Sequence, residues 1–412
     1  MKKKKIIVPL VLLLAVAVYW VFFHKDKTLR FIPDNADAIV LIDVKQVTGQ
    51  YIFSFITHPS RWSGGKKKDD KNSSLKDSGV RIPDFLQVFH LKGSRFSEWY
   101  TVLELKDPQK FQRFLKDQKF TDKGNLCFQK DQIFMMIDGD FCIAGTAEHA
   151  FEPIRQYLSS SSPKKTLHAD QLIQGTPGSI SFISGTKIQN FSVELKDDEI
   201  EIKNNIGFNG LSSIESRLQQ TPHFLEMELD AVNVKQYARF FNKSIADSSE
   251  ISKFRAVADL EQVNDTIISY EYDDNFNEIE KKSFQKIIQP NYIIDLQSRV
   301  PEKTWTYFQS KKWINTENQF TAIPFQPNKV SRSGSGITIE SVRKPQALSS
   351  GLKENFILIR NNPLLFSSLK SLGKTEKKII SDIDYILYEN QGADYRVKMK
   401  AKKGEFPLIL RW

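Results

Sequence analysis

The chain has few cysteines, and this limits its covalent and metal chemistry. Its 412 residues include only Cys127 and Cys142. Two thiols alone cannot complete a structural zinc site, which takes four ligands. Both lie in short apolar runs separated by a third run, Ile133 to Ile137. If these runs form a meander, the cysteines lie on its outer strands, about 9–10 Å apart, which is beyond disulfide reach. We therefore expect free, buried thiols.

The sequence also lacks the motifs of common enzyme classes. It contains no phosphate-binding Gly-x-x-x-x-Gly-Lys-Ser/Thr, no Gly-x-Gly-x-x-Gly and no His-Glu-x-x-His, so nucleotide and zinc-protease sites have no support. Ser333-Gly-Ser-Gly336 does not have the order of a nucleophile elbow. A calcium-loop spacing begins at Asp273 but fails at Glu278, where glycine is required. We predict no catalytic residue, no cofactor and no metal ligand.

One long apolar run is present, at the N-terminus. Ile6 to Phe23 contains 18 residues and no charge. As a helix it would span about 27 Å, close to the roughly 30 Å hydrocarbon core of a bilayer. Its aromatic side chains gather near the far end, where they favour the membrane interface. The run predicts a transmembrane anchor, represented by Ile6, Val11, Leu14, Tyr19, Trp20 and Phe23.

Basic residues before the run set the expected orientation. Lys2, Lys3, Lys4 and Lys5 precede it, and cytoplasmic flanks are enriched in lysine and arginine. We expect a single-pass protein of a bacterial inner membrane, with the N-terminus in the cytoplasm and the bulk of the chain in the periplasm. A cleavable signal peptide with its site at Ala15-Val16-Ala17 is the alternative. It would leave the apolar residues Val18 to Phe23 on the mature chain, which favours the anchor.

The basic segment explains most of the net charge. The whole chain carries +10, but residues 1–30 hold seven Lys or Arg and one Asp, a net charge of +6. The other 382 residues carry the remaining +4, an ordinary charge for a soluble domain. We expect the membrane as a partner, and no nucleic acid.

A strand followed by a helix recurs near residues 38–56, 99–117, 224–243 and 356–372. In the second case, Asp107-Pro108 provides an N-cap and a proline at the first helical position. In the third, Phe224 to Leu229 alternates, and Tyr237, Phe240 and Phe241 then share one helix face.

This recurrence favours an α+β fold, with an N-terminal transmembrane helix followed by two related modules of antiparallel sheet packed with helices. The expected domains are a cytoplasmic tail (1–5), the anchor (6–23), a linker (24–37) and exported modules at 38–215 and 216–412. An unduplicated α+β chain with similar runs is the alternative.

The start of the exported part resembles uncharacterised membrane-anchored envelope proteins of Bacteroidota. The likeness rests on the anchor followed by Phe31-Ile-Pro-Asp-Asn-Ala-Asp-Ala-Ile-Val-Leu-Ile-Asp-Val44, and on Asp138-Gly-Asp140 before a strand and a helix. The resemblance implies an exported envelope protein and no particular activity.

We therefore expect a non-enzymatic envelope protein that acts as a scaffold or binding module, with an envelope protein or a glycan as partner. Two alternatives stay open. One is an enzyme acting on the cell wall, glycans or lipids through carboxylates assembled across the fold. The other is a lipid-binding or chaperone-like module, which requires a large apolar cavity between helix and sheet. The 30 phenylalanines are mostly core residues, but on sheet faces they can form an apolar cleft or a partner surface.

Overall fold

The chain divides into two compact units. The computed structural model describes residues 24–57, 78–160, 167–210, 214, 217, 221–241, 250–322, 328–348, 351, 354–368, 372–404, 408 and 411. Unit 1 comprises the chain up to Ile206 together with Lys403–Arg411, and unit 2 comprises Gly207–Lys402. The predicted anchor and the four lysines before it lie outside the described residues. No helix within the described part has the length and apolar character needed to cross a bilayer.

The described strands of unit 1 form one antiparallel sheet and a separate two-stranded pair. The sheet order is β12-β11-β10-β2-β3-β4-β8-β7-β6-β5. The strands are β2 (Ala36–Asp43), β3 (Phe85–Leu91), β4 (Tyr100–Glu104), β5 (Thr121–Gly124), β6 (Cys127–Lys130), β7 (Ile133–Asp138), β8 (Phe141–Gly145), β10 (Gly178–Ser184), β11 (Lys187–Lys196) and β12 (Glu199–Lys203), with β1 (Thr28–Leu29) pairing β9 (Leu167–His168). The helices are α2 (Val44–Thr57), α3 (Pro108–Asp117), α4 (Phe151–Ser159) and the short 3-10 helix η3 (Ala169–Gln171).

Local sequence signals explain how α3 is placed in unit 1. The Asp107 carboxylate accepts a hydrogen bond from the Lys110 backbone N–H at 2.9 Å, and Pro108 occupies the first turn. This confirms the predicted N-cap. The buried face of the helix, Phe111 and Leu115, then packs against the meander of β6, β7 and β8.

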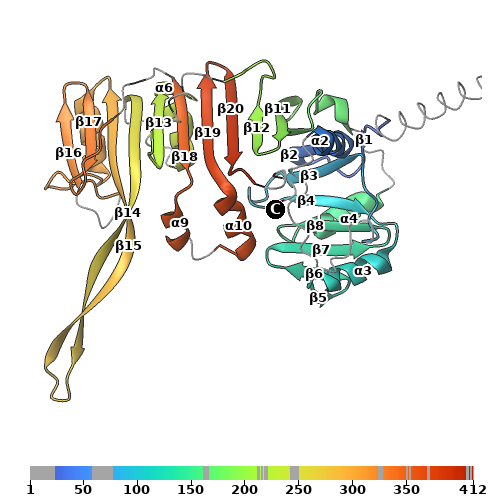
Figure 1. Ribbon diagram of the computed structural model, residues 1–412, viewed down its shortest axis with the longest axis horizontal. Helices are drawn as coiled ribbons and strands as arrows, with labels where there is room; N and C mark the ends of the chain where they lie inside the picture. The colour runs from blue at the N-terminus through green and yellow to red at the C-terminus, as the bar shows by residue number, and fades with distance from the viewer. Residues whose placement is uncertain are drawn as a thin grey trace, which may run out of the picture. The chain divides into compact units, whose positions relative to one another are not determined.

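The described strands of unit 2 form a second antiparallel sheet, in the order β20-β19-β18-β13-β14-β15-β17-β16 (Figure 1). They are β13 (Leu225–Asp230), β14 (Ile251–Tyr272), β15 (Glu278–Ser298), β16 (Asn328–Ser333), β17 (Gly336–Ser341), β18 (Asn355–Arg360), β19 (Ile383–Gln391) and β20 (Asp394–Ala401). The helices are α6 (Ala231–Phe241), α8 (Pro301–Ser310), α9 (Pro363–Ser368) and α10 (Lys374–Asp382). In Figure 1, β14 and β15 continue well past the sheet as a two-stranded arm.

The two sheets share one topology. Taken along the chain, the unit 1 strands β2, β3, β4, β7, β8, β10, β11 and β12 occupy the same relative sheet positions as β13 to β20 of unit 2. In both units a helix follows the first strand (α2 and α6), and another helix beginning with proline follows the third (α3 and α8). Eight strands in one order, with two helices at matching connections, are the pattern expected of a duplicated module.

The expected fold class was wrong. Strands make up 48% of the structure and helices 21%, so the fold is dominated by antiparallel sheet and is not α+β with packed helices. The main reason is strand length. Sequence alternation marked only residues 266–272 as a strand in that region, whereas β14 and β15 have 22 and 21 residues. Such long strands show no single alternation of polar and apolar residues, because both of their faces change environment along the strand.

Candidate apolar binding site

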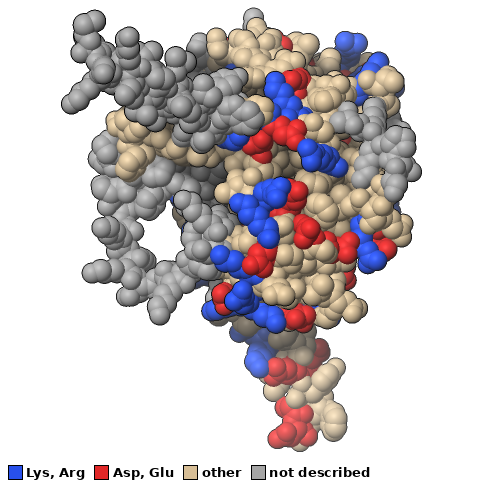
Figure 2. Space-filling model, turned by 90° about the vertical axis from the view of Figure 1, so that its right-hand side faces the viewer, with Lys and Arg blue, Asp and Glu red and all other residues tan. Residues whose placement is uncertain are grey.

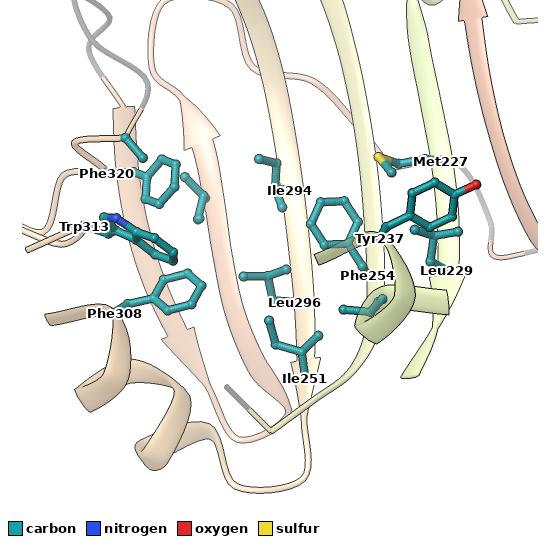
Figure 3. Close-up of a pocket in the computed structure, with 13 residues that line it drawn as sticks. Met227, Leu229, Tyr237, Ile251, Phe254, Ile294, Leu296, Phe308, Trp313 and Phe320 are labelled. Atoms are coloured by element: carbon teal, nitrogen blue, oxygen red, sulfur yellow. The ribbon is translucent and has the colours of Figure 1, made fainter. Parts of the chain in front are cut away.

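Unit 2 contains an apolar cavity on one face of its sheet (Figure 3). Its volume is about 480 Å³, which lies within the roughly 300–1,000 Å³ range of ligand pockets. The floor is formed by four adjacent strands, β13, β14, β15 and β17, and helices α6 and α8 supply part of the walls. The lining residues are Met227, Leu229, Val234, Tyr237, Ile251, Phe254, Ile294, Leu296, Phe308, Trp313, Phe320, Ala322 and Ile339.

Strand alternation makes the floor of the cavity apolar. On β15, Ile294 and Leu296 line the cavity. Asp295 lies between them in the sequence and pairs with Arg255 of β14, with 2.7 Å between the guanidinium and the carboxylate. Successive residues of a strand point to opposite faces, so the ion pair belongs to the other side of the sheet. On β13, Met227 likewise lines the cavity.

A cluster of aromatic rings forms the wall nearest α8. Phe308 comes from the last turns of this helix, and Trp313 and Phe320 come from the segment after it. The Phe308 and Trp313 rings are 5.2 Å apart and nearly perpendicular, and Phe320 is 6.4 Å from Phe308. The Trp313 backbone N–H donates to the Phe308 carbonyl at 2.9 Å. Edge-to-face packing of this kind adds to area burial and holds the rings in fixed positions.

A hydrogen-bond network at the start of α6 positions the opposite wall. The Asp230 carboxylate accepts from the Asn233 backbone N–H at 2.9 Å, as an N-cap does. The Asn233 side chain accepts from the Tyr388 hydroxyl at 2.9 Å. Tyr388 packs edge-to-face on Tyr237, with ring centroids 5.3 Å apart. These contacts connect α6 to β19 and direct the Tyr237 ring toward the cavity, as Figure 3 shows.

None of the described residues that line the cavity is charged. Of the thirteen lining residues, only Tyr237 and Trp313 have a conventional hydrogen-bond donor. Burial raises the pKa of Tyr237 to about 12, so its hydroxyl stays neutral at physiological pH. No lining side chain is a nucleophile or an acid–base group that would titrate near neutrality. The described lining can therefore bind an apolar group by burial.

A second arrangement, in unit 1, has the connectivity of a Ser-His-Asp triad. His90 Nδ1 lies 2.6 Å from the Asp37 carboxylate, and Ser94 Oγ lies 3.1 Å from His90 Nε2. The Ser94 hydroxyl, however, donates to the Leu91 carbonyl at 2.7 Å, and Nε2 is 3.0 Å from the Arg95 carbonyl, to which only a protonated nitrogen can donate.

The protonation of His90 follows from its surroundings. Burial acts to lower the pKa of His90, but the hydrogen bonds to Asp37 and to the Arg95 carbonyl outweigh it, so the pKa is raised. A general base must instead offer Nε2 unprotonated to the serine. The hydrogen bonds of His90 therefore stabilise the turn after β3, and His90 does not activate Ser94 as a nucleophile.

Both cysteines are free, as predicted, but only one of them is buried. Cys127 lies on β6 and Cys142 on β8, with β7 between them. Cys142 is fully buried, whereas Cys127 is half-buried, so the prediction of burial was wrong for Cys127. Burial raises the pKa of the Cys142 thiol to about 12. Asp273, which suggested a calcium loop, accepts hydrogen bonds from Asn275 and Asn277 and closes the turn at the tip of the arm. Within the described segments, no group of three or more His, Cys, Asp or Glu is placed to hold a metal.

The sequence identified part of this site. The alternation of 224–229 and the helix bearing Tyr237 were predicted, and both contribute to the lining. The contributions of β15, α8 and the segment 313–322 were missed. Val300-Pro301 was an available signal, because proline favours the first turn of a helix. The predicted anchor residues lie outside the described residues.

Comparison with known proteins gave no assignment: no protein-family model, no curated protein and no solved structure matches this chain.

Proposed function

We propose that this protein is a membrane-anchored, non-enzymatic envelope protein whose second unit binds one acyl chain in the apolar cavity. The observation that carries the proposal is the cavity itself, which has about 480 Å³ of space and no charged side chain among the described residues that line it. The anchoring of the chain in a membrane through Ile6 to Phe23 is supported by the length and apolarity of that run.

The size of the cavity suits one chain. A methylene group occupies roughly the volume of a water molecule in the liquid, about 30 Å³, so the cavity holds about 16 methylenes. Burying each methylene contributes about 0.8 kcal/mol before the cost of association. A long acyl chain therefore supplies enough free energy for micromolar or tighter binding, whereas a short chain does not.

A bound chain should stabilise unit 2. It removes the apolar lining of an open pocket from water. It also binds the folded state and not the unfolded chain, which shifts the equilibrium toward the folded state.

The proposal favours a binding module over an enzyme. The carboxylates of the sheet beneath the cavity, such as Asp295, pair with cations on the other face. Catalysis on a bound lipid would need a polar group aimed into the cavity, and none of the lining residues provides one that titrates near neutrality.

Fluorescent fatty-acid binding to the purified full chain in detergent tests the proposal. We expect saturable binding that palmitate displaces, and an increase of about 5–10 °C in the Tm of unit 2 when ligand exceeds Kd a hundredfold. Ala322→Trp should weaken binding, because Ala322 is exposed yet lines the cavity and so lies at its opening.

The matched control is Thr316→Trp, at an exposed residue of the same segment that does not line the cavity. It should bind like the unmodified chain. No saturable binding by the unmodified chain, or equal loss in the two variants, would contradict an acyl-chain site.

A further inference from the structure

Helix α2 of unit 1 is apolar on its outer face. Ile52, Phe53 and Ile56 are 43%, 68% and 67% exposed. The inner side of the helix, which lies against β2 and β3 (Figure 1), carries the buried Val47 and the half-buried Ser54. A surface helix of a soluble domain normally has its apolar stripe toward the core and its polar residues outside. The large apolar side chains of α2 point the other way, and a contiguous exposed patch of this kind marks an interaction surface.

The chain enters unit 1 beside the first turn of this helix. His24 is the first residue that the structure describes, directly after the predicted anchor. The Lys45 ammonium donates a hydrogen bond to the His24 carbonyl. The Asp84 carboxylate pairs with Lys45 at 2.8 Å and accepts from the Asp26 backbone N–H at 2.8 Å. These contacts hold the start of α2 next to the point where the anchor would end.

Lys45 and the exposed apolar side chains share one face of α2. Ile52 and Ile56 follow Lys45 by seven and eleven residues, which is about two and three turns at 3.6 residues per turn. At a rise of about 1.5 Å per residue, the apolar patch ends about 16 Å along the helix axis from Lys45. The patch therefore begins beside the end of the anchor and continues along the same face. The helix contains no acidic residue that anionic lipids would repel.

The arm of β14 and β15 also exposes apolar side chains, but its charge does not suit a bilayer. Tyr270 and Phe284 are 60% and 76% exposed. Residues 264–286, however, contain six acidic residues and three lysines, a net charge of −3. Acidic side chains gather at the tip of the arm, at the lowest point of Figure 2. Attraction to the negative surface of a bilayer depends on basic residues, so of these two surfaces α2 is the better match for lipid.

We propose that the outer face of α2 lies in the interfacial layer of the bilayer that holds the anchor, so that unit 1 rests on the membrane surface. Helices in this position lie in the plane of the interface, with their apolar face about 5–10 Å deep at the boundary of headgroups and acyl chains. The anchor keeps the patch beside the bilayer, so contact is an intramolecular step and a modest apolar surface suffices. The inference rests on the proposed anchoring of the chain, and it does not require acyl binding by unit 2.

Single fluorescent probes on α2 test the contact in the full chain reconstituted into phosphatidylethanolamine–phosphatidylglycerol vesicles. In a Cys127→Ser background the buried Cys142 resists labelling, so Ile56→Cys and Gln50→Cys each carry one nitrobenzoxadiazole group. Gln50 is exposed on the same helix, about 120° around the axis from Ile56. The Ile56 probe should be quenched by nitroxide-labelled lipids and shielded several-fold from aqueous iodide. The Gln50 probe should show the reverse.

The outcomes separate this contact from the anchoring. A chain that floats with the vesicles while the Ile56 probe remains accessible to iodide keeps the anchor but overturns the contact. A chain that does not float overturns both. Equal quenching of the two probes by lipid nitroxides would also contradict the proposed face. Shielding from iodide without quenching by lipid would mean that protein covers the patch instead.

A charge placed on the patch provides a second test. Phe53→Asp should abolish quenching of the Ile56 probe by lipid nitroxides, because a carboxylate on this face is repelled by the anionic surface and resists burial. Its Tm in detergent should change by no more than about 2 °C, since Phe53 is exposed. Gln50→Asp introduces the same charge one turn earlier, outside the patch, and should leave the quenching unchanged. Retained quenching in Phe53→Asp, or equal loss in the two variants, would overturn the inference.

Discussion

Substituting Ile294 by tryptophan should shorten the acyl chain that unit 2 prefers. Ile294 lies on β15 with its side chain in the cavity (Figure 3). The substitution adds about six heavy atoms, but because ring atoms are compact it fills only on the order of 60 Å³ more at protein packing density. This is about an eighth of the 480 Å³ present, and it is equivalent to about two methylenes.

The loss of two methylenes sets the expected magnitude. At about 0.8 kcal/mol each, it removes about 1.6 kcal/mol of binding free energy for a chain that filled the cavity. Affinity for palmitate should therefore fall about 15-fold. A chain about two carbons shorter should lose little, so the optimum of the chain-length profile moves toward tetradecanoate. Because the added ring fills space, the Tm without ligand should be unchanged or higher.

Displacement of a fluorescent fatty acid by a series of saturated acids from eight to eighteen carbons measures this profile. Ile293→Trp provides the control, because Ile293 is the preceding residue of the same strand and faces the other side of the sheet. An optimum that stays at sixteen carbons in Ile294→Trp, or an equal shift in Ile293→Trp, would show that the acyl chain does not lie in this cavity.

Three further predictions concern stability and reactivity. Asp37→Asn should destabilise unit 1 by about 1–2 kcal/mol, because it removes the charge-assisted hydrogen bond from His90. Because the pKa of His90 is raised on folding, this contribution is complete below the pKa of His90 in the unfolded chain and is lost as the pH rises through its pKa in the folded protein. The Tm difference between Asp37→Asn and the unmodified chain should therefore shrink between pH 6 and pH 9. Gly336→Ala should lower the Tm of unit 2 by several degrees and abolish acyl binding, because the added Cβ would lie 1.9 Å from a backbone oxygen of β15. Gly334 has open space around it, so Gly334→Ala should do neither. Cys142 should resist thiol reagents in the native protein and react fully in denaturant, as a mass-spectrometric count of labels will show.

The sequence predicted some of the strands and helices that line the cavity, but it did not predict the cavity. Alternation on 224–229 and the helical spacing at Tyr237 predicted two walls correctly, because both patterns are local and periodic. Trp313 and Phe320 lie in an irregular segment, where no period reveals which way a side chain points. Whether apolar faces pack closely or leave a cavity depends on the volumes of residues brought together from distant parts of the chain.

The repeated strand-and-helix units were recognised, but their correspondence was not. The helix of 99–117 was compared with those near 224–243 and 356–372. Its topological counterpart is α8, which follows the third strand of unit 2 as α3 follows the third strand of unit 1. The strand before α8 was obscured by its length, because β15 begins in the solvent-exposed arm and ends in the buried sheet. A pattern that changes along one strand has no single period to detect.

The continuity of β14 and β15 has a thermodynamic consequence. The same two strands carry Phe254 and Ile294 in the cavity wall and Tyr270 and Phe284 on the arm. A long sheet ribbon transmits changes in its twist, so filling the cavity should alter the alignment of the arm. Any partner that holds the arm would then be linked reciprocally to the acyl chain. The factor by which a bound acyl chain changes the affinity of the arm for such a partner must equal the factor by which that partner changes the affinity for the chain.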